Sequence, residues 1–185
     1  MPGPAFDPNG AVRFDMTNGA TSDSRGVKFV LVPAAALEAL ERTTPGALAH
    51  IGSEVGRACG ARIVAKLGGE TGVRGSTLDV LVTHLAGELA IAGLGSVSVE
   101  QWGKALVVVI ANASVNSDGF IAAALAGAVG AAAGRDVSMI PIGREGNVAR
   151  FYVGTQQTMI RCRSLVSSGK TWMEILQALQ PKVGT

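Results

Sequence analysis

Three glycines, Gly52, Gly56 and Gly60, recur at four-residue spacing in a stretch whose apolar residues follow the period of a helix. A helix is predicted to start near Thr44, which can cap it, and Pro45 suits its first turn. Each glycine lowers the stability of a helix by roughly 1 kcal/mol relative to alanine. Because residues four apart lie on one side of a helix, the spacing predicts compensation through close approach of another helix or a ligand.

The apolar arc of this predicted helix supplies the candidate site residues. It is formed by Ile51, Val55, Ala58, Cys59 and Ile63, with the three glycines extending it. Arg62 and Lys66 fall at its edge, where they can either snorkel or contact acidic groups of a partner. We take Gly52, Gly56, Gly60 and Arg62 as candidate interface residues of a homodimer, with Cys59 and Ile63 as candidate ligand contacts.

Much of the apolar content is alanine and glycine, which predicts a thin and tightly packed core. Hydrophobic residues make up 48% of the chain and charged residues 16%, a composition that excludes a disordered protein. The most apolar run, Gly119–Gly134, is 16 residues long. A spanning helix needs about 20, so we predict a buried core helix and no integral membrane segment. The N-terminus lacks a basic region followed by an apolar stretch, which predicts a cytoplasmic protein.

Charge and residue counts argue against several classes of site. A net charge of +2 and scattered basic residues do not favour nucleic-acid binding. Two cysteines, Cys59 and Cys162, cannot form a structural zinc site alone, and we expect no cofactor. His50 and His84 are not accompanied by a nucleophile-elbow sequence. These observations predict a protein that is not an enzyme.

The order of predicted elements defines the domain organisation and the fold class. Residues 1–26 contain three prolines and show no sustained periodicity, so we predict a flexible tail. Residues 27–180 are predicted to form a single α+β domain with C-terminal helices. Hairpins at about 96–111 and 135–153 flank the Ala/Gly-rich helix, which predicts a four-stranded antiparallel sheet packed against a helical layer.

Local signals add two capping boxes and a glycine-rich connector. Ser76 with Asp79 and Thr171 with Glu174 have the capping-box spacing at the start of predicted helices. The glycine-rich stretch 66–76 has amides and an arginine before a helix N-terminus, as an anion site would. Its spacing does not match a nucleotide loop, and it follows a helix rather than a strand, which favours a flexible connector.

Four short segments resemble the superfamily of TRAPP vesicle-tethering subunits and bacterial 4-vinyl-reductase-type domains. They are residues 51–57, 95–102, 123–127 and 150–153, within a resemblance that spans about residues 34–155. The resemblance implies a TRAPP-like fold, pairing through the first helices, and an apolar pocket between helices and sheet. Relatives can carry lipid near Cys59, although a buried cysteine among small residues is normally inert.

The final hairpin departs from the bacterial pattern. Many bacterial members carry a Cys–Gly–Cys pattern there, whereas Pro141 and Ala149 occupy the corresponding positions in this chain. A metal or redox role tied to that pair is therefore not expected.

Two functions are compatible with these observations. The first is a non-enzymatic adaptor that homodimerises through its Gly/Ala-lined helices and binds an unidentified protein partner. The second is a sensor domain that holds a small apolar ligand between helices and sheet. An enzyme ranks third, since it would need a site that none of these motifs indicates.

Overall fold

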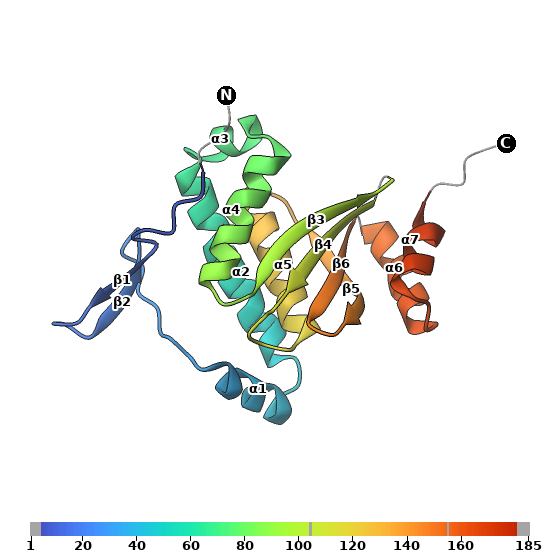
Figure 1. The fold of residues 1–185 in the computed structure, drawn as a ribbon, viewed down its shortest axis with the longest axis horizontal. Coiled ribbons are helices and arrows are strands. Elements are labelled where there is room, and N and C mark those ends of the chain that lie inside the picture. The colour runs from blue at the N-terminus through green and yellow to red at the C-terminus, as the bar shows by residue number, and fades with distance from the viewer. Residues whose placement is uncertain (1–4, 104, 155, 181–185) are drawn as a thin grey trace.

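A four-stranded antiparallel sheet separates two layers of helices in the computed structural model, which describes residues 5–103, 105–154 and 156–180 (Figure 1). The strands are β3 (Ser96–Trp102), β4 (Ala105–Ala111), β5 (Ser138–Glu145) and β6 (Val148–Gly154). They follow the spatial order β3-β4-β6-β5, with every neighbouring pair antiparallel. The predicted α+β class, with a four-stranded antiparallel sheet on helices, is confirmed.

Strand β4 shows why this sheet is covered on both faces. Its residues are apolar throughout, and side chains of a strand alternate between the two faces. Val108 and Ile110 therefore join one core, while Val107 and Val109 join the other. A continuous apolar run is what a strand buried on both faces requires.

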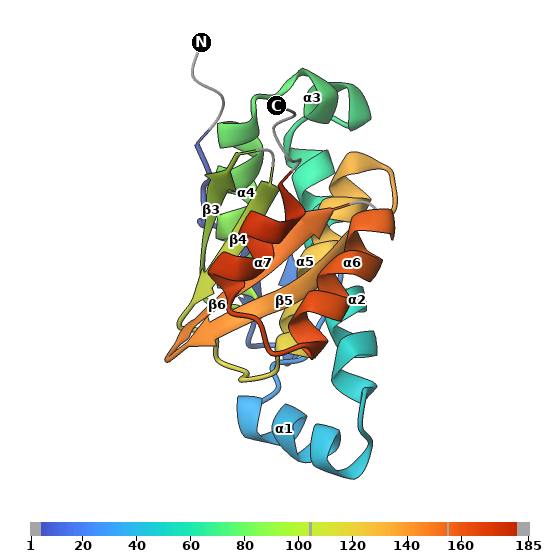
Figure 2. The same cartoon turned by 90° about the vertical axis from the view of Figure 1, so that its right-hand side faces the viewer.

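The larger helical layer consists of α2 (Ala47–Lys66), α4 (Leu78–Ile91) and α5 (Asp118–Ala133). Helices α6 (Gln156–Ser167) and α7 (Trp172–Leu179) cover the opposite face of the sheet (Figure 2). Helix α5 is buried along much of its length, as predicted for the Ala/Gly-rich run. No helix in the described part of the chain combines the length and hydropathy that a bilayer crossing requires.

The glycine face of α2 is occupied by α5 of the same chain. A Cβ added at Gly52, Gly56 or Gly60 would collide with the backbone carbonyl oxygens of Phe120, Ala124 and Ala128, respectively. Close approach of a helix is thus present, but the helix is not a partner's. The prediction that these glycines form a dimer interface is therefore corrected: their lack of side chains serves intramolecular packing.

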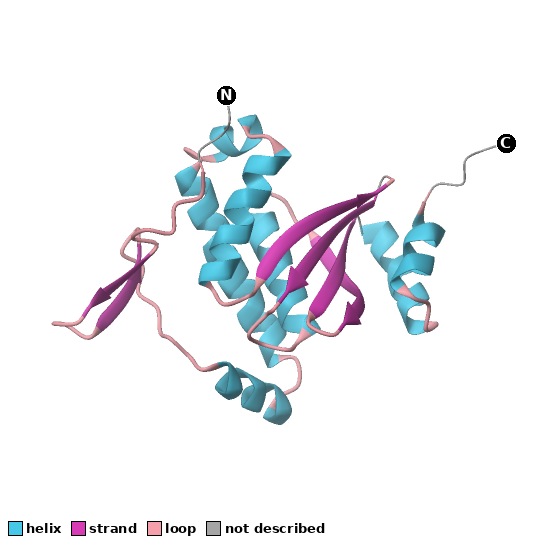
Figure 3. Ribbon diagram, viewed as in Figure 1, coloured by secondary structure: helices cyan, strands magenta, loops and turns pink. Residues whose placement is uncertain are grey.

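The N-terminal segment is structured rather than a flexible tail. Strands β1 (Val12–Asp15) and β2 (Ala20–Asp23) form a hairpin, and α1 (Ala34–Thr43) follows after an extended link (Figure 3). The prediction for residues 1–26 is wrong over residues 12–23, and its first four residues lie outside the described ranges. Sequence periodicity misses this hairpin because three of the four residues in β1 are exposed.

Of the two predicted capping boxes, one is confirmed and the other is wrong. The Thr171–Glu174 capping box is present at the start of α7. The one predicted at Ser76 is wrong, since Thr77 caps α4 by accepting a hydrogen bond from the amide of Val80. The predicted glycine-rich connector contains a short helix, α3 (Glu70–Gly75).

Candidate functional site

An apolar cavity of about 130 Å³ lies between the larger helical layer and the sheet. Within the described ranges, no lining residue carries a polar side chain. The lining comes from α2, α3, the start of α4, α5 and all four strands of the main sheet: Ile63, Val73, Leu78, Leu81, Val82, Leu85, Val99, Leu106, Val108, Ala128, Val129, Ala132, Ala133, Met139 and Val153.

Small residues on α5 make the space. Ala128 and Ala132 line the cavity from the helix, and an alanine methyl group fills less space than a larger apolar side chain would. Alternation along the strands brings Val108 and Met139 to the same side of the sheet, where both are buried. The void follows from short side chains on one layer meeting medium-sized ones on the other.

Helix α3 closes one end of the cavity. Gly68 and Gly69 have φ angles of 82° and 89°, a left-handed region that favours glycine, and they turn the chain back after α2. The turn places Val73 in the cavity wall with only 7% of its surface exposed. Leu78, 55% exposed at the start of α4, lies at the rim. The glycine-rich stretch therefore shapes an apolar wall, which differs from both the anion site and the flexible connector.

A buried ion-pair cluster lies beside the cavity, on α2 and α4. Glu88 is 1% exposed, and its carboxylate lies 2.6 Å from Arg62 Nε and 3.0 Å from Lys66 Nζ. Two cations for one carboxylate suit a buried acid, which is costly to leave unpaired. Burial on its own would lower the pKa of Arg62, but the contact with Glu88 outweighs it and raises that pKa.

The same cluster holds the N-terminal segment. Arg62 Nη1 lies 3.8 Å from the carboxylate of Asp23, which is 2% exposed at the end of β2. The ring of Phe6 lies over Lys66, with its centroid 4.1 Å from Nζ, and makes an edge contact with His84. Arg62 and Lys66 thus contact acidic groups of their own chain, and the predicted role of Arg62 in a dimer interface is corrected.

Cys59 is packed beside Arg62 and does not line the cavity. Its Sγ lies 3.2 Å from Arg62 Nη2 and its side chain is fully buried. Burial raises the pKa of the Cys59 thiol to about 11, and burial also raises that of Cys162 to about 11. Both thiols are therefore protonated near neutral pH and poorly nucleophilic. Across the part of the chain that the structure describes, no group of His, Cys, Asp and Glu side chains could hold a metal ion.

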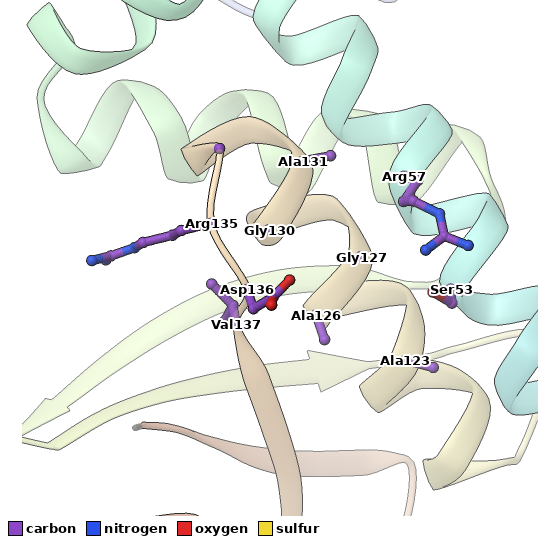
Figure 4. Close-up of a pocket in the computed structure, with 11 residues that line it drawn as sticks. Ser53, Arg57, Ala123, Ala126, Gly127, Gly130, Ala131, Arg135, Asp136 and Val137 are labelled. Carbon is purple, nitrogen blue, oxygen red and sulfur yellow. The ribbon is translucent and has the colours of Figure 1, made fainter. Parts of the chain in front are cut away.

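A second hollow of about 440 Å³ lies on the outer side of α2 and α5 (Figure 4). Its floor is made by Ala126, Gly127 and other small residues, and exposed charged residues stand at its rim. Asp136 turns toward the hollow, while the side chain of Arg135 extends away from it. An open surface of small residues offers a ligand less contact than the buried cavity does.

The structure places the predicted site residues in three different environments. Ile63 lines the cavity, and its contact with a ligand stays a prediction. Cys59 and Arg62 belong to the ion-pair cluster, and the three glycines pack against α5. Sequence reasoning missed Glu88 as the centre of that cluster, although an acid among apolar residues of its helix, with Arg62 and Lys66 at the edge of another, was an available signal.

Comparisons with known proteins give a likeness of fold but no family. No protein-family model matches the sequence, and no curated protein is similar to it. Among solved structures, the chain resembles the phenol-responsive sensory domain of the transcription activator PoxR, determined with phenol. The TM-score is 0.52 at 14% sequence identity, over 77% of this chain and 84% of that one. A likeness at this identity shows a shared fold.

Proposed function

We propose that the protein is a sensory domain that binds a small apolar molecule in the cavity between its helices and sheet. The observation that carries the proposal is the lining of the cavity, which is apolar at every described position. The cavity has a volume of about 130 Å³. A dry apolar cavity of about 150 Å³ is large enough to bind benzene. The available volume therefore suits a ligand of about that size.

The position of the cavity supports a sensing role. Its walls come from the larger helical layer and from the sheet, so a ligand would contact α3, the start of α4 and the sheet together. Ile63 directly follows Arg62 of the ion-pair cluster on α2, and Leu85 precedes Glu88 by about one turn on α4. A shift of these helices on binding would reach the N-terminal hairpin through Arg62 and Asp23.

The fold likeness points in the same direction. The PoxR domain is described as phenol-responsive, and its fold resembles that of this chain. We carry over only the class of function, a domain that responds to a small molecule. Membership of the TRAPP and 4-vinyl-reductase superfamily and a cytoplasmic location stay predictions that rest on the sequence.

Thermal unfolding with added benzene or toluene tests the proposal. A ligand that binds only the folded state at 100 times its dissociation constant stabilises that state by about 2.7 kcal/mol, so Tm should rise with ligand concentration. Ala132→Leu should fill the cavity and abolish the rise. Ala123→Leu makes the same change on α5 at the outer groove, and should keep it. Failure of wild-type protein to bind benzene, toluene or xenon would count against the proposal.

We also propose that the domain acts without catalysis. Its two thiols, Cys59 and Cys162, are buried with raised pKa values, which withdraws both from nucleophilic chemistry. Binding, rather than reaction, is the activity that an apolar cavity supports.

Self-association is a second candidate, on a different surface from the one predicted. Val30, Leu31 and Val32 are 82%, 65% and 50% exposed in the link before α1, and α1 itself has no buried residue. Consecutive exposed apolar residues are typical of a surface that a partner covers. Light scattering on a size-exclusion column over a range of concentrations would reveal a dimer, and Leu31→Glu should dissociate it. A monomer at every concentration would exclude this candidate.

A further inference from the structure

The wall of the cavity carries information about the chemistry of its ligand. Val108 and Val153 lie in the two central strands, β4 and β6, whose backbones are paired in the sheet, so their amides and carbonyls are already used. Val99 lies on the edge strand β3 and contributes an apolar side chain. Met139 on β5 pairs with Val153 on β6, so all four strands contribute to the sheet side of the cavity. The helical side is built from α2, α3, α4 and α5. Interior backbone groups of α2, α4 and α5 bond within each helix, and on α3 the amide of Val73 donates to the carbonyl of Gly69 while its own carbonyl accepts from the amide of Ser76.

The charged groups of the ion-pair cluster beside the cavity, Arg62, Lys66 and Glu88, are paired with one another. Arg62 immediately precedes Ile63 on α2, but its guanidinium is paired with Glu88 and lies near Asp23. Lys66 is paired with the other oxygen of Glu88. None of these three residues lines the cavity in the described part of the chain. A ligand hydroxyl placed there would lose its hydrogen bonds to water without gaining a protein partner.

We infer that the cavity selects small hydrocarbon rings, such as benzene and toluene, over rings of the same size that carry a hydroxyl group. This inference rests on the proposed function and names its ligand class. Met139 lines the cavity, and a thioether makes favourable contacts with an aromatic ring. The inferred class thus differs from the phenol found with the structurally similar PoxR domain.

Benzene and phenol form the decisive pair, because they differ by one hydroxyl on the same ring. We expect benzene to bind wild-type protein with a dissociation constant at least about tenfold lower than that of phenol, a ratio equal to about 1.4 kcal/mol. Isothermal titration in sealed cells would measure both constants. Phenol binding as tightly as benzene, or more tightly, would overturn the inference and leave the proposed function standing. Absence of binding by either ring and by xenon would overturn both.

A hydroxyl added to the wall should change the preference. Val108→Thr replaces a buried lining side chain with one of similar shape that can donate and accept a hydrogen bond. The ratio of phenol to benzene affinity should rise several-fold. Val97→Thr makes the same change on β3 at a position that does not line the cavity, and should leave the ratio within twofold of wild type. An unchanged ratio in a folded Val108→Thr protein would contradict the inferred selection.

Discussion

Gly56 marks the tightest approach of α2 to α5. A Cβ at this position would overlap the backbone carbonyl of Ala124 and approach its Cα to 2.9 Å. Backbone on both sides cannot yield as a flexible side chain would. Even the smallest side chain must therefore push the two helices apart.

Gly56→Ala should lower the free energy of unfolding by about 1–3 kcal/mol, the range for overpacking a well-filled core. This loss should exceed the gain in helix propensity of roughly 1 kcal/mol. Urea denaturation followed by circular dichroism measures the difference. Gly119→Ala is the matched control on α5, because its Cβ would meet no atom closer than 4.0 Å. Equal midpoints for Gly56→Ala and wild type would contradict the packing described here.

Asp23 is a second residue with a measurable signature. Burial on its own would raise the pKa of Asp23, but the amides of Val27 and Arg25 and the Arg25 guanidinium outweigh it and lower that pKa. A carboxyl group with a lowered folded pKa contributes stability that is present above its unfolded pKa. That contribution is lost as the pH falls through the folded value.

The unfolded pKa of aspartate is near 3.9, so the contribution of Asp23 should be complete at pH 6 and fade below about pH 4. Urea denaturation of wild type and Asp23→Asn at pH values from 6 to about 2.5 tests this. The wild type should be the more stable at pH 6, and the two should converge in acid. A difference that stays constant throughout would mean that Asp23 titrates alike in the folded and unfolded chains.

Among the elements, the N-terminal hairpin has an unusual attachment. The hairpin itself contacts α2 through an ion pair between Asp23 and Arg62, and the segment before it contacts α2 through the Phe6 ring over Lys66. Both cations are positioned by Glu88. A single buried carboxylate on α4 thus organises the surface on which a separate element docks.

Glu88→Gln should loosen this attachment and lower the free energy of unfolding by about 3–5 kcal/mol, since Arg62 and Lys66 would lose their buried counter-charge. Hydrogen exchange at residues 12–28 should accelerate more than exchange in α5. Glu54→Gln is the control, because its ion pair with Arg57 is solvent-exposed and should contribute less than about 1 kcal/mol. Unchanged exchange in the hairpin would show that the ion-pair cluster does not stabilise its attachment.

The elements also show what hydrophobic pattern can and cannot predict. The strand at 105–111 and the Ala/Gly-rich helix are correctly predicted because each is an uninterrupted run of apolar or small residues, which indicates burial. The hairpin at 12–23 is missed because few of its side chains are buried and its tether depends on polar contacts distant in sequence. Small residues are ambiguous: Gly56 permits contact with α5, while Ala132 on α5 leaves a void. The apolar pattern predicts that Ile63 is buried, but the cavity beside it depends on how the helices meet the sheet.

Across the molecule, the sheet keeps two cores apart. The cavity belongs to the core beneath α2, α4 and α5, whereas α6 and α7 pack on the other face. Trp172 holds α7 to the sheet through three described contacts. Its ring lies 5.4 Å from that of Trp102 and 4.4 Å from the guanidinium carbon of Arg150, and its Nε1 donates a hydrogen bond to Glu145.

Trp172→Ala should therefore affect the core beneath α6 and α7 without affecting ligand binding in the other core. Removing a half-buried tryptophan should destabilise the protein by about 1–3 kcal/mol, less than the 3–5 kcal/mol typical of a fully buried one. Hydrogen exchange should rise in α6 and α7. The dissociation constant for benzene should stay within about twofold of wild type, because none of the three contacts of Trp172 described above involves a residue that lines the cavity. A much larger loss of affinity would show that β4, which is shared by both cores, transmits packing from one face of the sheet to the other.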